Sequence, residues 1–592
     1  MALSPDIFAG TYSVGTPVFT RDSTSLFYLS GAGLARLWRQ DLESGERTCL
    51  AAPDEQIAIV RRSPVDDTLI LGLDTGGDER QQLLLLNPGN GQLAPLTQNP
   101  PVIHDFGGWS PDGTRIVFAA NERDEANFDI HELELLSGAR RILFRGEGIV
   151  SVIGYNRDAT KMAVLHDRAY GDMDLLILDL TAAAPVSVFP RPSGTNYASV
   201  RWSGDGTALL ALTDHGGQEH MRLCRLDPVT GDVTVVHEAP GRDVEGWSIS
   251  PDGQGLATIE NDGGWSVLRI GPITQERKPN NVVPRGVIDG LTYSPDSTSI
   301  AFTVQGPTSP PALWICRQGQ AWPIFAPEQP VNPSELVNFT QVAWESFDGR
   351  EVRGWMALPP GPVPPSGHPA VIWVHGGPVG EARPNFRPDL QMLLRQGLAV
   401  LMPNVRGSSG RGRSWAERDD IEKRPDAVQD LMYGRHFLGK HSSIDPTRIG
   451  LLGQSYGGYM VNAAVTEYPD QWKACANYYG IVDFMTTLAG TGPWRRGHRA
   501  AEYGDPVRDA ALLARLSPIH RAGDIQVPMF VAHGNRDPRV PFSESEQLVT
   551  ALLKHQKPVT FLKFERAGHG FIRREDKTRV YQGVAAFFAE HL

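Results

Sequence analysis

The chain has 592 residues, of which 41% are hydrophobic and 21% charged, a composition typical of a soluble globular protein with more than one domain. Its formal net charge of −12, without any block of lysines and arginines, excludes a general affinity for nucleic acid or for an anionic membrane. The first residues have neither a basic start nor an apolar run, and no later run approaches a membrane span, so we expect a cytoplasmic protein.

The four cysteines are scattered without paired spacing: Cys49, Cys224, Cys316 and Cys475. This pattern indicates neither a disulfide framework nor a metal site, and we interpret all four as small core residues. The motifs in the sequence do not indicate a cofactor site, so no cofactor is predicted.

The first half of the chain repeats one pattern, in which a strand end, a tight turn containing Asp and a second apolar strand follow one another. Seven copies occur, with turn aspartates at positions 22, 66, 112, 158, 205, 252 and 296, a period of 44 to 47 residues. Each repeat has room for about four short strands, which cannot bury both faces alone, so the pattern predicts a seven-bladed β-propeller. We interpret the aspartates as turn residues, because a calcium site needs several oxygen ligands and each turn supplies one.

The repeat stops at residues 327–333, where three prolines interrupt the alternation. This predicts a linker, with residues 1–330 forming the propeller and residues 331–592 a second domain. Because the first repeat begins within the first twenty residues or so, we expect little or none of the N-terminus to join the second domain.

The second half alternates apolar strands with helical stretches. A hairpin is predicted over 340–345 and 352–358, strands over 370–374, 398–402, 449–452, 474–479, 529–531 and 559–564, and helices over 426–438, 543–554 and 577–592. Strands that are apolar throughout favour a sheet buried on both faces, and their alternation with helices favours parallel crossovers. The second domain is therefore predicted to be a doubly wound α/β domain.

Three reactive side chains follow strand ends in the order Ser455, Asp537, His569. In an open parallel sheet the reactive groups lie on the loops that leave the carboxyl ends of the strands. Ser455 stands in Gly453-Gln-Ser-Tyr-Gly457, the pattern of a nucleophile elbow, and the order is that of an α/β-hydrolase triad. The serine hydroxyl needs an imidazole to take its proton, and the imidazole needs a carboxylate to fix its tautomer.

Two other features compete with this interpretation. Asp483 also follows a strand and could serve as the acid, although the loop of Asp537 is the more usual place. The segment Gly407-Ser-Ser-Gly-Arg-Gly412 resembles a phosphate loop but lacks the Gly-Lys-Ser/Thr ending, so we set it aside. The loop His375-Gly-Gly-Pro378 follows a strand and is suited to point an amide at an oxyanion, with the N–H of Tyr456 as the second donor.

Five motifs together resemble the prolyl oligopeptidase family of serine peptidases, and most of all its acylaminoacyl-peptidase branch. They are His375-Gly-Gly-Pro378, Asn404-Val-Arg-Gly-Ser-Ser-Gly410, Gly453-Gln-Ser-Tyr-Gly-Gly-Tyr459, His533-Gly-Asn-Arg-Asp537 and Gly568-His-Gly-Phe571. The resemblance implies that Ser455, Asp537 and His569 form the triad, that Gly377 and Tyr456 supply the oxyanion amides, and that Arg406 supports the active-site loops. It also implies hydrolysis of short or unfolded peptides in a cavity between the domains.

The substrate pocket is the least defined part of the predicted site. Phe484, Trp494 and Val540 are expected as pocket walls, and the segment 491–499 carries three arginines where aromatic residues would be the plainer lining. One hypothesis is that Arg495 or Arg496 holds a substrate carboxylate, because arginine binds carboxylates bidentately. The favoured function is a serine peptidase of the acylaminoacyl-peptidase type. A carboxypeptidase or dipeptidyl-peptidase mode and a small-molecule esterase are the alternatives, and the complete triad speaks against a non-catalytic propeller scaffold. The oligomeric state stays open, with a homo-oligomer as one possibility.

Overall fold

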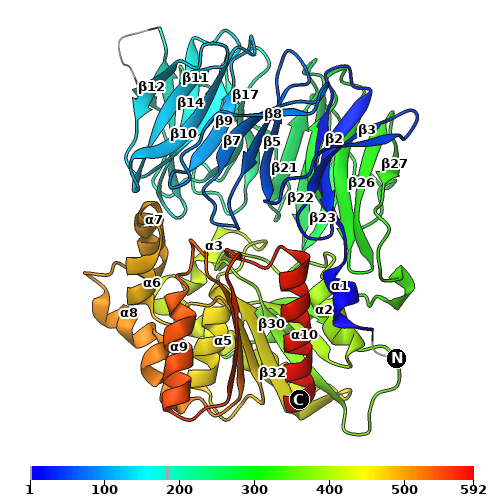
Figure 1. Cartoon of the computed structure of the whole chain (residues 1–592), viewed down its shortest axis with the longest axis vertical. Coiled ribbons are helices and arrows are strands. Elements are labelled where there is room, and N and C mark those ends of the chain that lie inside the picture. Colours follow the sequence, from blue (N-terminus) through cyan, green and yellow to red (C-terminus); the bar gives the residue numbers. More distant parts are fainter. Residues whose placement is uncertain (1–2, 182–185) are drawn as a thin grey trace.

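The computed structural model describes residues 3–181 and 186–592. A set of small β-sheets from the first half of the chain lies on top of an α/β domain from the second half (Figure 1). Within the described residues, no helix combines the length and the hydropathy that crossing a bilayer requires.

Seven antiparallel sheets make up the upper part, which confirms the predicted seven-bladed propeller. The first four are β1 (Ser13–Phe19), β2 (Ser25–Gly31), β3 (Arg36–Asp41), β4 (Arg47–Ala51); β5 (Ile57–Arg62), β6 (Leu69–Leu73), β7 (Gln82–Asn87), β8 (Gln92–Pro95); β9 (His104–Trp109), β10 (Arg115–Asp124), β11 (Asn127–Glu134), β12 (Arg140–Arg145); and β13 (Ile149–Tyr155), β14 (Lys161–Ala169), β15 (Asp172–Asp179), β16 (Val186–Val188). The other three are β17 (Tyr197–Trp202), β18 (Leu209–Thr213), β19 (Arg222–Leu226), β20 (Val233–His237); β21 (Val244–Ile249), β22 (Gly255–Asp262), β23 (Trp265–Pro272); and β24 (Val287–Tyr293), β25 (Ser299–Gly306), β26 (Ser309–Arg317), β27 (Gln320–Phe325).

The repeated turns are held by their own side chains. In the third sheet the Ser110 hydroxyl donates to Asp112 at 2.6 Å, and Asp112 accepts from the backbone N–H of Thr114 at 3.1 Å. These hydrogen bonds lower the pKa of Asp112 to about 2. The recurring aspartate is thus a turn-stabilising residue, as its position predicts.

The ring closes by packing rather than by a shared sheet. Strands β1 and β2 of the first sheet and β25 and β26 of the last contribute to one buried cluster, which includes Phe19, Tyr28, Leu313 and Ile315. Burial of this apolar area holds the first and last blades side by side. The propeller can therefore act as a stable cover for the domain below it.

The lower part is built on one eight-stranded sheet with the order β28-β29-β31-β30-β32-β33-β34-β35. Its strands are β28 (Thr340–Glu345), β29 (Glu351–Ala357), β30 (His368–Val374), β31 (Ala399–Asn404), β32 (Ile444–Gln454), β33 (Cys475–Tyr478), β34 (Met529–Gly534) and β35 (Val559–Phe564). Strands β30 to β35 run parallel, while β28 and β29 form the antiparallel hairpin at one edge. The predicted hairpin and strand positions agree with this sheet.

Helices cover both faces of the sheet. They are α2 (Pro388–Arg395), α3 (Arg413–Ala416), α4 (Arg424–Gly439), α5 (Tyr456–Glu467), α6 (Phe484–Gly490), α7 (Pro493–Tyr503), α8 (Ala510–Leu516), α9 (Ser543–Lys554) and α10 (Arg574–His591), with short 3₁₀ turns η1 (Pro333–Glu335), η2 (Glu417–Asp419), η3 (Ile421–Lys423) and η4 (Pro518–Asp524). The helix α7 projects toward the propeller (Figure 1).

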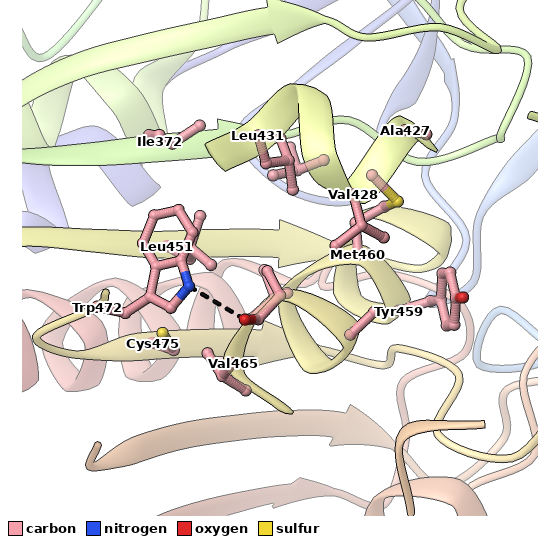
Figure 2. Packing of buried hydrophobic residues seen from close by; sticks show 14 of the residues in the cluster. Ile372, Ala427, Val428, Leu431, Leu451, Tyr459, Met460, Val465, Trp472 and Cys475 are labelled. Atoms are coloured by element: carbon pink, nitrogen blue, oxygen red, sulfur yellow. Dashed lines mark hydrogen bonds between the residues drawn. The ribbon is translucent and has the colours of Figure 1, made fainter. Parts of the chain in front are cut away.

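The core divides into two clusters because successive side chains of a strand point to opposite faces. On β30, Ile372 and Val374 belong to the cluster under α4 and α5, whereas Val371 and Trp373 belong to the cluster under α2 and α10. Figure 2 shows the first cluster, where the Trp472 indole N–H donates to the carbonyl oxygen of Ala464 at 3.1 Å. The sheet is thus buried on both faces, as its apolar strands predict.

The N-terminus departs from the prediction. Helix α1 (Pro5–Ala9) packs against α2 and α10, and Phe8 is fully buried in the cluster on that face of the sheet. The Gln396 side chain also donates to the carbonyl oxygen of Leu3 at 3.0 Å. The expectation that little of the N-terminus joins the second domain is therefore wrong, because the apolar pair Phe8-Ala9 completes the hydrolase core before the first blade begins.

One cysteine also differs from its interpretation as a core residue. Cys224, Cys316 and Cys475 are buried free thiols, but Cys49 is exposed. Cys49 lies on β4, the outermost strand of the first blade, where three successive residues face solvent.

Candidate active site

Ser455 stands at the sharp turn between β32 and α5, with φ 57° and ψ −123°. Non-glycine residues rarely adopt this conformation, and such strain is typical of functional sites. The flanking glycines are needed for space. A Cβ on Gly453 would lie 2.1 Å from the carbonyl oxygen of Gly457, and a Cβ on Gly457 would lie 2.2 Å from that of Val374. The tight crossing of strand and helix therefore places the serine at the end of the sheet.

The structure brings Ser455, His569 and Asp537 into one hydrogen-bonded row. The Ser455 hydroxyl lies 2.9 Å from Nε2 of His569, and Nδ1 of His569 lies 2.6 Å from Oδ2 of Asp537. Because Nδ1 faces a carboxylate, it carries the proton, and Nε2 is left to accept from the serine. This is the geometry needed to make a serine hydroxyl nucleophilic.

The Asp537 carboxylate is fully buried and well supplied with donors. Its Oδ1 accepts from the backbone N–H groups of Arg539 at 2.8 Å and Val540 at 3.0 Å. Its Oδ2 accepts a second hydrogen bond from Nε2 of His533 at 3.2 Å. Burial raises the pKa of Asp537, but the neighbouring His569 and the hydrogen bonds from both histidines outweigh it and hold the pKa well below the usual value. The acid is therefore ionised beside His569.

Two side chains that the sequence does not single out hold this row in place. His533, fully buried at the end of β34, accepts from the Ser545 hydroxyl at Nδ1 over 2.8 Å, so its Nε2 carries the proton donated to Asp537. Tyr479, just after β33, packs its ring 4.7 Å from the ring of His569. Both residues carried a positional signal in the sequence, because the motif 533–537 contains His533 and the strand predicted over 474–479 ends at Tyr479.

The predicted oxyanion donors stand on the two segments that flank the serine. The loop 375–378 runs so close that a Cβ on Gly376 would lie 3.3 Å from Cβ of Ser455. Gly377 has a φ of 142°, which favours glycine. Tyr456 is the first residue of α5, so its N–H is one of the first-turn donors that have no partner within the helix.

The competing residues have structural roles. Asp483 caps helix α6, where its carboxylate accepts from the backbone N–H of Met485 at 2.8 Å. The glycine-rich loop 407–412 packs against the carboxylates of Asp419 and Glu219, surroundings that do not suit a phosphate.

Arg406 lies beneath the active-site loops and is almost fully buried. It donates to the two carboxylate oxygens of Asp430 at 2.9 and 2.8 Å and reaches Asp348 at 3.3 Å. Its guanidinium thereby ties the loop after β31 to helix α4 and to the β28–β29 hairpin.

A cavity of about 590 Å³ lies between the propeller and the hydrolase domain and reaches His569. Its charged lining divides by domain. The propeller contributes Asp74, Glu79, Asp105 and Asp167, and the hydrolase domain contributes Arg495, Arg499 and Arg539. Burial raises the pKa of Asp74 and of Asp167 to about 6.

The five predicted substrate-binding residues separate in the structure. Trp494 and Arg495 line the cavity. Phe484 and Val540 are buried side chains of the core beneath it. Arg496 is exposed on the other side of α7 and donates to the carbonyl oxygen of Ala489 at 2.7 Å.

The hypothesis of a free arginine for a substrate carboxylate is weakened by a contact across the domain boundary. Glu79, in the loop between β6 and β7, accepts from Arg495 of α7 and from Arg539 of the loop that follows Asp537. Both guanidinium groups are therefore engaged by one propeller carboxylate. Sequence patterns had no means of finding this pairing, because its partners lie more than 400 positions apart.

The pairing of Glu79 belongs to a consistent pattern at the boundary. The propeller supplies the acid and the hydrolase domain the arginine in Asp54–Arg566, Asp54–Arg573, Glu55–Arg573, Glu79–Arg495, Glu79–Arg539, Asp214–Arg413 and Glu245–Arg383. Arg566 and Arg573 bracket His569 in the sequence, so these ion pairs hold the histidine loop against the propeller.

The chain is similar in sequence to one described protein family and to several named proteins. Residues 384–592 match the family model described as "Prolyl oligopeptidase family". The chain is 27% identical to dipeptidyl aminopeptidase BIII of Pseudoxanthomonas mexicana over 89% of this chain and 79% of that one. It is 22% identical to the human acylamino-acid-releasing enzyme over 69% of this chain, but spans about half of that relative, 53%.

Solved structures share the whole fold. A puromycin-hydrolyzing peptidase of Mycobacterium tuberculosis aligns with a TM-score of 0.88 at 20% identity, covering 100% of this chain and 96% of its own. The acylaminoacyl peptidase of Pyrococcus horikoshii aligns with a TM-score of 0.77 at 19% identity, covering 100% and 98%. At these identities the alignments show a common propeller and hydrolase architecture.

Proposed function

Because residues 384–592 match the prolyl oligopeptidase family, we propose that Ser455, His569 and Asp537 are the catalytic triad of a serine peptidase that hydrolyses short or unfolded peptides. The observation that carries the proposal is the row of hydrogen bonds Ser455–His569–Asp537 at 2.9 and 2.6 Å, beside a cavity covered by the propeller.

The chemistry of each step follows from this geometry. Nε2 of His569 takes the hydroxyl proton as Ser455 Oγ attacks the scissile carbonyl carbon, and Asp537 stabilises the imidazolium that forms. The N–H groups of Gly377 and Tyr456 are proposed to donate to the carbonyl oxygen as it becomes an oxyanion. His569 then gives its proton to the leaving amine, and an acyl-enzyme ester remains on Ser455. Water, activated by the same imidazole, hydrolyses that ester.

The propeller restricts the substrate to short or unfolded chains. The cavity has a volume of about 590 Å³, which suits a few residues rather than a folded domain. The propeller cover, rather than the cavity volume, favours the peptidase proposal over a small-molecule esterase, because the same triad would serve an esterase but such a cover would not be needed.

An acylaminoacyl-peptidase mode is the leading proposal for the peptide end that is recognised. It is supported by the five motifs and by the similarity to the human acylamino-acid-releasing enzyme. A dipeptidyl mode is the second candidate, since Asp74, Asp105 and Asp167 on the propeller side of the cavity suit a free α-ammonium group, and one relative is named a dipeptidyl aminopeptidase. A carboxypeptidase mode is disfavoured by the engagement of Arg495 and Arg539 with Glu79.

Product mapping by mass spectrometry tests these modes. Each peptide of a panel is supplied with a free or acetylated N-terminus and with a free or amidated C-terminus. Release of acetylated residues alone supports the acylaminoacyl mode, and release of dipeptides from free N-termini alone supports the dipeptidyl mode. If the parent and Ser455→Ala cleave the panel equally, the peptidase proposal fails.

We propose a cytoplasmic site of action, because all four cysteines are free thiols and one of them, Cys49, is exposed. Cell fractionation followed by immunodetection of the protein tests this.

A further inference from the structure

A cluster of ionisable side chains lies buried beneath the residue that follows the nucleophile. Arg424, the first residue of α4, is fully buried, as is Asp419, and Glu502 of α7 is 2% exposed. Arg424 lies 3.4 Å from Asp419 and 3.7 Å from Glu502. The triad and the substrate cavity do not use any of the three.

The cluster is centred on the phenol of Tyr456. Arg424 donates to the Tyr456 hydroxyl oxygen at 2.6 Å, and that hydroxyl donates to Oδ2 of Asp419 at 2.7 Å. The guanidinium carbon lies 5.1 Å from the centre of the Tyr456 ring, and a second nitrogen donates to the backbone carbonyl oxygen of Glu502 at 3.0 Å. The side chain of Tyr456 is therefore held at its ring and at its hydroxyl.

The same cluster reaches the other proposed oxyanion segment. Gly407 packs so closely on Asp419 that a Cβ there would lie 2.2 Å from the carboxylate carbon. The next residue, Ser408, hydrogen-bonds Nε2 of His375 at 2.9 Å, and His375 begins the loop that contains Gly377. One carboxylate thus contacts the supports of both donor segments.

Stability alone does not account for this arrangement. Desolvating a fully buried arginine and carboxylate is costly, and apolar side chains of similar volume commonly stabilise a core as well or better. The neighbours are apolar and aromatic, with Phe484 and Tyr503 also within 6 Å of the Arg424 guanidinium. Apolar side chains could therefore have filled this site in place of the arginine and the carboxylate.

We propose that Asp419 and Arg424 are positioning residues, which hold Tyr456 so that its backbone N–H points at the substrate oxyanion. This rests on the proposed peptidase function. Loss of one oxyanion donor slows comparable enzymes about a hundredfold to a thousandfold. A donor that is displaced rather than removed should cost less, about tenfold to a hundredfold in kcat.

Two variants test the proposal. Tyr456→Phe removes one hydroxyl and keeps the ring. The paired variant Asp419→Asn with Arg424→Met removes both charges at once, so neither is left alone in the core. Burial raises the pKa of Glu502 to about 8 in the parent, and this burial remains in the paired variant, so we expect Glu502 to add no unpaired charge there at neutral pH. Arg435→Met on the same helix is the matched control, since Arg435 contacts the backbone carbonyl of Gln471 outside the cluster.

The measurements are kcat, KM, thermal midpoint and the Ki of a peptidyl trifluoromethyl ketone, which forms a tetrahedral adduct with the serine. We expect kcat to fall about tenfold in Tyr456→Phe and up to a hundredfold in the paired variant, with KM within about twofold. The Ki should rise in parallel with the loss of kcat/KM. The control should match the parent in kcat, KM and Ki.

Three results would overturn the proposal: unchanged kcat in variants that fold, a change in KM alone, or a changed side-chain preference at the cleavage site. If the paired variant does not fold, Tyr456→Phe decides the matter alone. An inactive parent would refute the proposed peptidase function instead, so the two failures are distinguishable.

Discussion

The contact of Glu79 with Arg495 and Arg539 predicts that the propeller takes part in catalysis by holding the acid loop. Arg539 donates its backbone N–H to Asp537, and the side chain of the same residue is held by Glu79. Replacing Glu79 by Gln keeps the size of the side chain and removes its charge. We expect a lower kcat/KM with the fold unchanged.

The expected fall in kcat/KM for Glu79→Gln follows from how exposed the three ion-paired side chains are. The side chains are 20% exposed at Glu79, 23% at Arg495 and 45% at Arg539, so each ion pair is partly screened and contributes at most about 1 kcal/mol. Two pairs at about 0.2–1 kcal/mol each together give about 0.4–2 kcal/mol, which corresponds to a fall in kcat/KM of about twofold to thirtyfold.

The assay is kcat/KM for one short peptide in low salt and in about 0.5 M salt. Salt screens partly exposed charges, so the parent should approach the variant at high salt, while Glu79→Gln should respond less. Glu467→Gln, which removes an ion pair with Arg521 far from the boundary, is the control and should behave as the parent. Equal kcat/KM for parent and Glu79→Gln in low salt would refute the reasoning.

Space, packing and charge give three further predictions. Gly457→Ala should lower the thermal midpoint and abolish activity, because its Cβ would lie 2.2 Å from the Val374 carbonyl oxygen; an active, stable variant would contradict this. Phe8→Ala should destabilise the hydrolase domain by about 3–5 kcal/mol in denaturant unfolding, and an unchanged midpoint would show that α1 is not part of that core. Asp537 has a depressed folded-state pKa, so its contribution to stability is fully present above the unfolded value of about 3.9 and is lost as the pH falls. The stability gap between parent and Asp537→Asn should therefore narrow only below about pH 4, and a gap that narrows between pH 7 and 5 would contradict the assignment.

Local patterns in the sequence predict much of this architecture. The turn aspartates recur because each hairpin needs the same hydrogen bonds, as at Asp112, so the propeller and its seven blades are visible from spacing alone. The glycines around Ser455 have a steric cause that acts within five residues. Strand ends in a parallel sheet meet at one edge, which is why Ser455, Asp537 and His569 could be placed near one another before the structure.

What the sequence does not predict depends on contacts between distant segments. Helix α1 is too short to show a periodic pattern, and only its packing on α2 and α10 shows which domain it joins. Glu79 is one acidic residue among many, and its role depends on two arginines from another domain. Arginine is a residue type that usually lies at the protein surface. The neighbours of Arg424 along the chain do not indicate that it is fully buried beneath Tyr456.

In the proposed mechanism Ser455 is the nucleophile and His569 activates it. A biotinylated fluorophosphonate, followed by digestion and peptide mapping, tests it most directly. We predict a single modified residue, Ser455, in the parent, and strongly reduced modification in His569→Ala, whose serine has lost its base. Labelling at another residue, or none at Ser455 in folded protein, would contradict the account.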